Sequence, residues 1–296
     1  MSEPSLFEKV PPALRGLVPA RFRTDIPIVP VVRLSGVIGV SSPLKPGMTL
    51  ASVARSLDRA FSMRHIRAVA LSINSPGGAA VQSHLIHRRI RTLADEKKVP
   101  VIAFVEDVAA SGGYMIACAA DEIVADVSSI VGSIGVVGGS FGFDKLIDKI
   151  GIERRLYTSG ENKAMLDPFL PEKPSDVEKL KALQRDIHES FIALVKARRG
   201  AKLDSRESAL FTGEYWTGQR GRELGLVDAL GDLRSTLRER FGDKVRMPLL
   251  AERGLFGRRT PGVSRSGLEQ LWSGPTLAED LVATLEARAL WSRYGL

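Results

Sequence analysis

Apolar and polar residues alternate along the first hundred positions in blocks that predict strands and helices in turn. The pattern predicts a strand at 28–36, an amphipathic helix at 51–62 and a buried strand at 67–74. The next helix has an apolar face made of Val81, Leu85, Ile86, Ile90 and Leu93. A third apolar strand follows at 99–105. This βαβ rhythm predicts an α/β fold on a mostly parallel sheet.

Shorter elements are expected in the middle of the chain. Residues 111–120 predict a short helix that opens at a glycine pair. The segments EIVA (122–125) and IGVV (134–137) predict short strands, and the helical segment after them ends at Gly151. The alternation of strand and helix therefore continues.

The clearest helix of the chain is expected from Ser175 to Arg199. Ser175 and Glu178 predict a capping box at its start, and Gly200 ends it. Its apolar stripe consists of Leu180, Leu183, Ile187, Phe191 and Leu194. The stripe is typical of an amphipathic helix.

Four segments are predicted along the chain. Residues 1–26 are rich in Pro and Arg and precede the first strand signal, so they are interpreted as an N-terminal arm. The folded domain is expected at 27–250. Residues 251–275 carry Gly, Pro, Ser and Arg without sustained periodicity and are interpreted as a linker. A C-terminal helix is expected at 276–296.

The composition is that of a globular chain. Its 296 residues, 44% of them apolar, can bury a substantial core. The net charge of +8 is spread thinly, which favours a solvated basic surface and no binding of nucleic acid. The single cysteine, Cys118, excludes an intrachain disulfide and is interpreted as a core residue. The absence of a signal peptide core and of a bilayer-length apolar segment predicts a cytoplasmic protein.

Three glycine-bearing turns are the candidate sites of chemistry: NSPGG at 74–78, ASGGY at 110–114 and SGENK at 159–163. The first two directly follow apolar strands, and such strand ends are where α/β folds bind ligands. Glycine lets backbone N–H groups approach an anion, as an oxyanion hole requires. Taken singly, each turn is better explained as a tight connection, and none has the phosphate-loop spacing.

Ser111 begins the short helix after the second turn and is a candidate nucleophile, although the turn alone favours an N-cap serine. No histidine follows a strand, so a Ser–His–Asp triad lacks its base. The histidines are His65, His84, His87 and His188. His84 and His87 have helical spacing but no third ligand signal, and are interpreted as surface residues rather than metal ligands.

A lysine can replace histidine as the base when burial lowers its pKa. Lys163 follows the third glycine turn and precedes the apolar, proline-containing segment MLDPFL. Most other lysines lie in charged helical faces. Lys163 is therefore the candidate base, with a surface loop lysine as the alternative.

Read together, the three turns resemble the signal peptide peptidase A family of Ser–Lys serine peptidases, in the Clp-protease/crotonase fold group. The resemblance runs from about Val31 to Asp232. It is carried by LSINSPGG, AASGGYMIACAADEIVA, VGSIGV, TSGENKAMLDPF and FTGEYWTGQRGRELGLVDALG. It implies a fold of repeated β-β-α units, to which this chain adds a C-terminal helical extension.

The resemblance assigns roles to residues of this chain. Ser111 corresponds to the nucleophile and Lys163 to the base. The amides of Gly78 and Gly112 correspond to the oxyanion hole, and Ser133 to the serine that orients the lysine amine. No metal or organic cofactor is implied.

Substrates and partners also follow from the resemblance. It implies hydrolysis of unstructured or hydrophobic peptides, such as signal-peptide remnants. Many family members carry an N-terminal membrane anchor, whereas we expect none here, and double-length members contain two copies of the domain. A single copy predicts a homo-oligomeric ring in which Ser111 of one subunit works with Lys163 of the next.

Two other interpretations remain open from the sequence. An acyl-CoA hydratase or isomerase on the same fold would need carboxylates, and Glu106 and Asp107 follow a strand. A non-catalytic scaffold would bind a membrane partner through the apolar face of the C-terminal helix. That face also offers peripheral contact with the inner membrane, but packing on the protein itself is favoured.

Overall fold

The computed structural model describes residues 26–39, 47–160, 162–204, 207–250 and 284–296. The predicted N-terminal arm, apart from its last residue, and the whole predicted linker lie outside the described residues. The predicted C-terminal helix is described from residue 284 onward, where residues 284–292 are helical. The three boundaries between the four predicted segments stay predictions.

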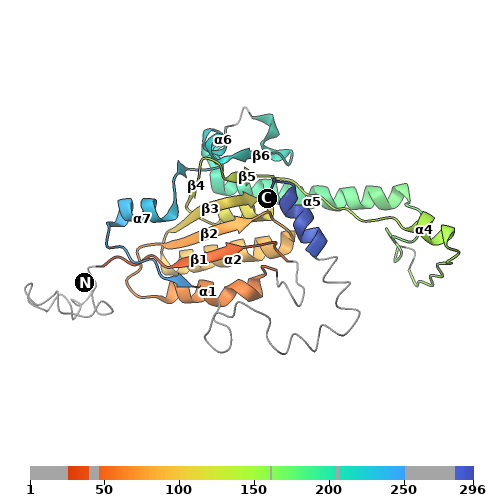
Figure 1. Ribbon diagram of the computed structural model, residues 1–296, viewed down its shortest axis with the longest axis horizontal. Helices are drawn as coiled ribbons and strands as arrows, with labels where there is room; N and C mark the ends of the chain where they lie inside the picture. Colours follow the sequence, from red (N-terminus) through yellow and green to blue (C-terminus); the bar gives the residue numbers. More distant parts are fainter. Residues whose placement is uncertain (1–25, 40–46, 161, 205–206, 251–283) are drawn as a thin grey trace, which may run out of the picture.

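Eight strands among the described residues form one sheet (Figure 1). Its main order is β6-β5-β3-β2-β1-β8, and β4 pairs with β3 and with β7. The strands are β1 (Val31–Ser35), β2 (Val69–Ser75), β3 (Val101–Ala110), β4 (Glu122–Ala125), β5 (Ile130–Gly132), β6 (Tyr215–Thr217), β7 (Ala229–Leu230) and β8 (Leu249–Leu250). All pairs are parallel except β5 with β6. The predicted α/β class is confirmed, and the arrangement is consistent with the crotonase-like group.

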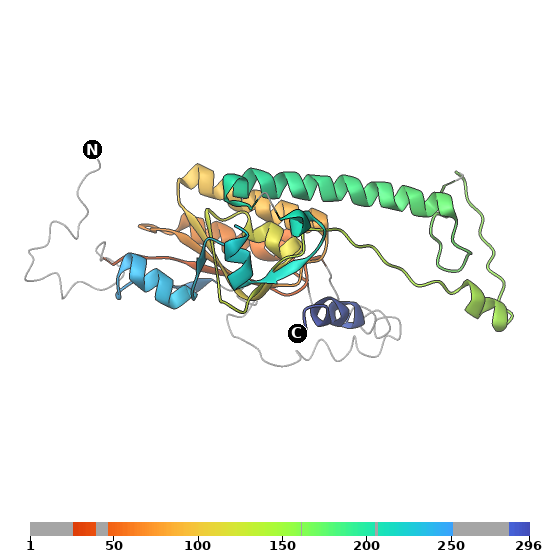
Figure 2. The same cartoon turned by 90° about the horizontal axis from the view of Figure 1, so that it is seen from above.

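Helices cover both faces of the sheet (Figure 2). One face packs against α1 (Leu50–Ser62), α2 (Ala80–Lys97) and α3 (Gly112–Ala117). The other face packs against α7 (Leu233–Phe241). Because strand side chains alternate, Val32 of β1 joins the first core and Val31 joins the second. Both faces of the sheet therefore bury apolar residues, as is usual for parallel sheets.

Residues 137–173 leave this body as an extension (Figures 1 and 2). The extension contains α4 (Asp144–Lys149), which has no buried residue. It returns to the body through α5 (Pro174–Arg199), whose buried residues lie at its C-terminal end: Phe191, Val195 and Arg199. Leu183 and Ile187, members of the predicted stripe, are exposed. Only the end of the stripe packs on the body.

The predicted start of this helix is wrong in detail. The helix begins at Pro174, directly after Lys173, and no side chain caps it. Proline is well suited to the first helical position because its φ is preset and it has no N–H to satisfy. Ser175 therefore lies inside the first turn, where its hydroxyl cannot act as the cap.

Two strand boundaries also differ from the prediction. The third strand does not end at 105 but continues to Ala110 as β3, so Glu106 and Asp107 lie within it. The strand predicted at 134–137 is instead formed by β5 (Ile130–Gly132). β4 pairs with the first half of β3 and β5 with its second half. The extra length of β3 thus gives two short strands a common partner.

Shorter elements complete the body. They are α6 (Gly218–Glu223) and two 3-10 helices, Gly200–Lys202 and Ser208–Phe211.

Across the described ranges, no helix has the length and apolar character needed to span a bilayer.

Candidate active site

Two of the glycine-bearing turns and the segment after β5 meet at one edge of the sheet, at the carboxyl ends of β2, β3 and β5. Ser75 pairs with Ala109, and Ala110 pairs with Gly132, so the ends of the three parallel strands lie side by side. The Ser111 N–H donates a 2.8 Å hydrogen bond to the Gly132 carbonyl. The SPGG turn, the ASGG turn and the segment that begins at Ser133, directly after β5, therefore form one site.

Ser111 has an unusual backbone conformation, with φ 52° and ψ −121°. Positive φ is strained for any residue with a side chain, and such strain concentrates at functional sites. Although Ser111 occupies the N-cap position of α3, its side chain makes no capping hydrogen bond. The N-cap interpretation therefore does not account for the hydroxyl.

Glycines let the first two turns approach each other closely. A Cβ on Gly77 would lie 2.8 Å from the Ser111 Cβ and 3.0 Å from the Gly112 nitrogen. Gly78 forms a parallel β-bridge with Ile38, and the hydrogen bonds of this bridge do not use the Gly78 N–H. No acceptor among the described residues takes the N–H of Gly78 or of Gly112. Two free amides next to Ser111 are the donors that an oxyanion hole needs.

Ser133 lies at the end of β5 and also has a positive φ, of 52°. Its N–H donates a 2.7 Å hydrogen bond to the Glu214 carbonyl, which continues the antiparallel pairing with β6. Its hydroxyl accepts a 3.2 Å hydrogen bond from the Tyr294 hydroxyl. The backbone of Ser133 is therefore held by the sheet, and its side chain by the C-terminal segment.

A cavity of about 400 Å³ opens at Ser111. Gly78 and Gly112 line it at the two turns, and apolar side chains line it from α3 and α5: Met115, Ile187 and Phe191. The C-terminal segment adds Leu290, Arg293 and Tyr294. A mostly apolar cavity with a few polar groups is typical of a substrate site.

Lys163 lies elsewhere, in the part of the extension between α4 and α5. Its side chain is exposed, and it is not among the described residues that line the Ser111 cavity. Its N–H donates a 3.2 Å hydrogen bond to the Gly160 carbonyl. The structure therefore brings Ser111, Gly78, Gly112 and Ser133 together and leaves Lys163 apart from them.

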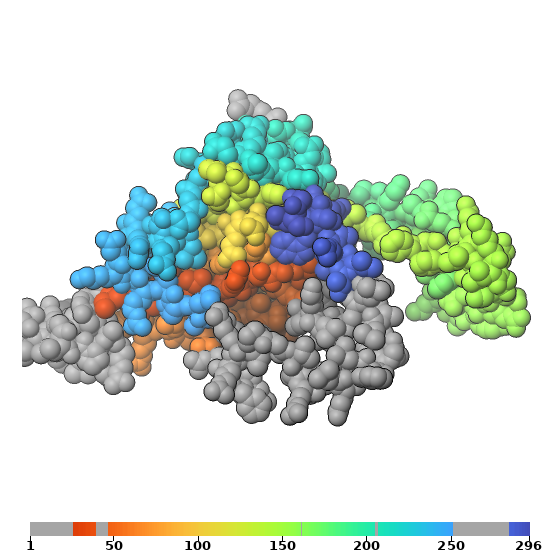
Figure 3. Space-filling model, in the orientation of Figure 1, coloured from red at the N-terminus to blue at the C-terminus, as the bar shows by residue number. Residues whose placement is uncertain are grey.

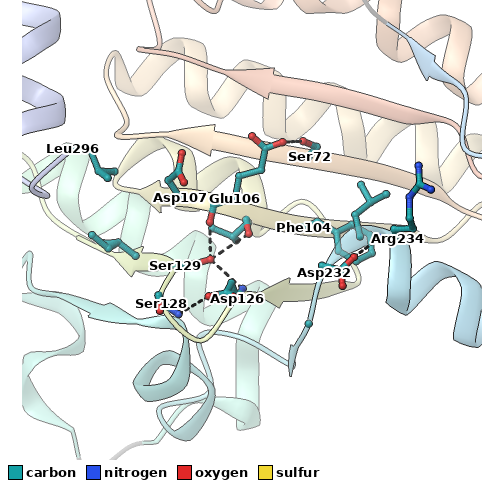
Figure 4. Close-up of a pocket in the computed structure, with 14 residues that line it drawn as sticks. Ser72, Phe104, Glu106, Asp107, Asp126, Ser128, Ser129, Asp232, Arg234 and Leu296 are labelled. Atoms are coloured by element: carbon teal, nitrogen blue, oxygen red, sulfur yellow. Dashed lines mark hydrogen bonds between the residues drawn. The ribbon is translucent and has the colours of Figure 1, made fainter.

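Glu106 and Asp107 line a different cleft, of about 540 Å³ (Figure 4). Glu106 accepts a hydrogen bond from the Ser72 hydroxyl, and Asp107 accepts a 2.6 Å bond from the Asn74 amide. Ser111 is not among the described residues that line this cleft. The carboxylates that a hydratase would need are therefore directed away from the Ser111 cavity.

The prediction that His87 is a surface residue is wrong. His87 is only 8% exposed, and burial, followed by the positive charge of Arg198, lowers its pKa to about 4. Cys118 is fully buried, as predicted, and burial raises the pKa of its thiol to about 12. Among the described residues, no cluster of three or more His, Cys, Asp or Glu could hold a metal ion.

Tyr294 is a residue of the site that the sequence did not identify. Tyr294 contacts Ser133 across 161 positions of sequence. The only signal was the position of Tyr294 near the end of an apolar helix, which predicts packing and not a hydrogen bond to a site serine.

The sequence of this chain is similar to those of known proteases. The model described as peptidase family S49 matches residues 94–242. Serine protease SPPA, chloroplastic, of Arabidopsis thaliana is 34% identical over 210 residues, which are 69% of this chain and 31% of that protein. A Synechocystis sp. protein described as a candidate protease is 32% identical over 238 residues, which are 77% of this chain and 80% of that protein.

A longer protein gives a closer match under a different name. A Brucella abortus protein named Na(+)/H(+) antiporter NhaA is 54% identical over 296 residues, which are 99% of this chain but 40% of that protein. The chain thus spans less than half the length of this relative and of Arabidopsis SPPA. The antiporter name describes a protein most of which has no counterpart here.

Proposed function

Because this chain belongs to peptidase family S49, we propose that it is a serine endopeptidase with Ser111 as nucleophile and Lys163 of a neighbouring subunit as base. One observation carries the proposal. An uncapped, strained serine faces a cavity beside two free amides, yet the described lining of that cavity supplies no base. Lys163, which matches the family's base, is exposed on the extension.

The reaction is acyl transfer in two steps. The neutral Lys163 amine takes the Ser111 hydroxyl proton as Oγ attacks the peptide carbonyl, and the N–H groups of Gly78 and Gly112 hold the oxyanion. The tetrahedral intermediate collapses, the C–N bond breaks, and the lysine ammonium gives its proton to the leaving amine. A water, deprotonated by the same amine, then attacks the acyl-enzyme, and Ser111 leaves with its proton restored.

The extension supports a lysine supplied by a neighbour. A lysine base needs burial in apolar surroundings, and the exposed Lys163 does not receive that burial from its own chain. Most exposed large apolar side chains of the described residues lie on the extension and the adjoining half of α5, including Phe141, Ile150 and Tyr157. Such an apolar surface fits a second copy of this chain, because the Ser111 site is incomplete without one.

The Ser111 cavity supports an apolar substrate. Met115, Ile187 and Phe191 line it, so it suits an apolar side chain next to the scissile bond. Unstructured or hydrophobic peptides, such as signal-peptide remnants, are the proposed substrates. The proposed mechanism uses no metal or organic cofactor. A cytoplasmic location with peripheral contact at the inner membrane stays a prediction.

Mixing two inactive variants tests the proposal. Ser111→Ala and Lys163→Ala are each expected to lose peptide hydrolysis, since a nucleophile and its base act as a unit. Co-assembled in equal amounts, they place an intact Ser111 beside an intact Lys163 at about a quarter of the sites of a head-to-tail ring. Peptidase activity should therefore return to roughly that fraction of the wild-type value.

Lys149→Ala is the matched control, because Lys149 is another exposed lysine of the extension. It should keep full activity. Turnover retained by Ser111→Ala would reject the nucleophile. Activity that stays at zero after subunit exchange has been verified by mass spectrometry would reject the shared site.

A further inference from the structure

The C-terminal segment reaches the Ser111 cavity from far along the chain. Residues 284–296 lie against the body, where Figure 3 shows them in dark blue over the strand region. Leu290, Arg293 and Tyr294 line the same cavity as Ser111. The end of the chain therefore contributes to the site, although it lies outside the segment that carries the family resemblance.

Tyr294 is the most enclosed residue of this segment, with 9% of its surface exposed. It packs on Val108 and Ala110 of β3, at the strand end that leads into Ser111. Its ring meets the Tyr215 ring edge-on, with centroids 5.0 Å apart. The Tyr294 hydroxyl donates its hydrogen bond to the Ser133 hydroxyl from this fixed position.

Tyr215 holds the same segment from β6. Its hydroxyl donates a 3.1 Å hydrogen bond to the Arg293 carbonyl. Tyr215 also pairs with Gly132, the residue before Ser133. One pair of strands thus fixes both the Ser133 backbone and the tyrosine that contacts its side chain.

The segment lines the cavity and does not fill it. A space of about 400 Å³ remains between Ser111 and the C-terminal residues. A segment that occupied the substrate position would leave no such space. Its residues therefore belong to the boundary of the site.

We propose that Tyr294 is a positioning residue, which acts on the reaction through Ser133. The assignment rests on the proposed function, in which Ser133 orients the lysine amine. The Ser133 oxygen has two lone pairs and one hydrogen. Tyr294 occupies one lone pair, which leaves the other to accept an N–H of the incoming Lys163 amine. The amine then directs its own lone pair at the Ser111 hydroxyl.

A double-mutant cycle tests the assignment on the full chain. Tyr294→Phe keeps the ring and removes the hydroxyl, and we expect kcat to fall roughly fivefold to tenfold with KM little changed, the effect of one neutral hydrogen bond. Ser133→Ala should lower kcat by more, because it removes the group that contacts the amine. In the Ser133→Ala background, Tyr294→Phe should have no further effect.

Tyr114→Phe is the matched control, because it removes a buried 2.8 Å hydrogen bond from Tyr114 to the Leu226 carbonyl without lining the cavity. It should lower stability and leave kcat unchanged. A Tyr294→Phe loss that persists undiminished in Ser133→Ala would mean that Tyr294 only docks the segment, and would overturn the assignment. So would a rise in activity, which would mean that the segment obstructs the site.

The Ser111→Ala variant separates this proposal from the proposed function. Turnover retained by Ser111→Ala would overturn both. An inactive Ser111→Ala variant together with no coupling between Tyr294 and Ser133 would overturn the Tyr294 assignment alone.

Discussion

The body around Ser111 and the extension that carries Lys163 differ in the burial of their apolar residues. In the body, β1, β2 and β3 bury apolar residues on both faces, and the Ser111 turn is packed so closely that several positions admit only glycine. In the extension, α4 has no buried residue, and Phe141 and Tyr157 are 76% and 91% exposed. The body completes its packing alone, whereas the extension presents the surface expected of an interface.

The largest effect is expected from charge placed on the extension. Phe141→Asp with Tyr157→Asp should abolish assembly and lower peptidase activity at least about 100-fold, because the neighbour would have to bury two charges. The stability of the body should change by less than about 0.5 kcal/mol, because both side chains are exposed in the single chain. Sedimentation velocity, peptide hydrolysis and urea unfolding measure the three quantities.

Val127→Asp is the control for that experiment, because Val127 is an exposed apolar residue of the body, 52% accessible. It should leave assembly and activity intact. Unchanged assembly in the double variant would show that the extension is not an interface.

A glycine in each region gives the second test. A Cβ on Gly78 would lie 2.1 Å from the Ile38 carbonyl oxygen, and its φ is 142°, so Gly78→Ala should cost roughly 2–4 kcal/mol of stability. At Gly139, near the start of the extension, an added Cβ would have no other atom within 4 Å. Gly139→Ala should cost less than about 0.5 kcal/mol. Urea unfolding measures both, and equal costs would contradict the difference in packing.

His87 gives the body a dependence on pH. Its pKa is about 4 in the folded chain, below the ordinary 6.5, because burial disfavours the charged ring. Between pH 6.5 and pH 4, His87 is therefore mostly protonated in the unfolded chain and mostly neutral in the folded chain. The stability of the folded chain falls as the pH drops through this range. The loss between pH 7 and pH 5 should be about 2 kcal/mol.

His87→Gln should remove most of that decline, because glutamine does not titrate. Urea unfolding of both proteins at pH 7 and pH 5 measures it. An equally steep decline in the variant would assign the pH dependence to other groups.

The sequence predicts the body well because the signals there are local and repeated. The period of apolar residues identified α1, α2 and β2, and the strand ends located the turns at Gly78 and Ser111. Glycine pairs after strands are informative because few other residues tolerate the close contact at Gly77 and Gly112. The spacing alone left two interpretations of Ser111 open, a nucleophile and an N-cap. The family resemblance favoured the nucleophile.

The extension and the C-terminal segment were harder to predict, for two physical reasons. The sequence pattern of an apolar stripe such as that of α5 is the same whether the stripe packs on its own core or is exposed in the single chain. The exposure of Leu183 and Ile187 could therefore not be predicted. The contact of Tyr294 with Ser133 joins residues that share no local pattern. The apolar run that predicts the third strand ends at Val105, yet β3 continues through Glu106 and Asp107.

The smallest effect concerns two helix starts, one in each region. Thr49 caps α1 in the body: its hydroxyl accepts from the Ser52 N–H at 3.2 Å, and the Ser52 hydroxyl accepts from the Thr49 N–H in return. Thr49→Ala should therefore cost about 1 kcal/mol. Ser175 has no such role at the start of α5, where its hydroxyl is directed at the Asp176 carboxylate at 3.4 Å. Ser175→Ala should cost less than about 0.5 kcal/mol, measured by urea unfolding and by hydrogen exchange in the first turn of each helix. Equal losses would contradict this difference between the two helix starts.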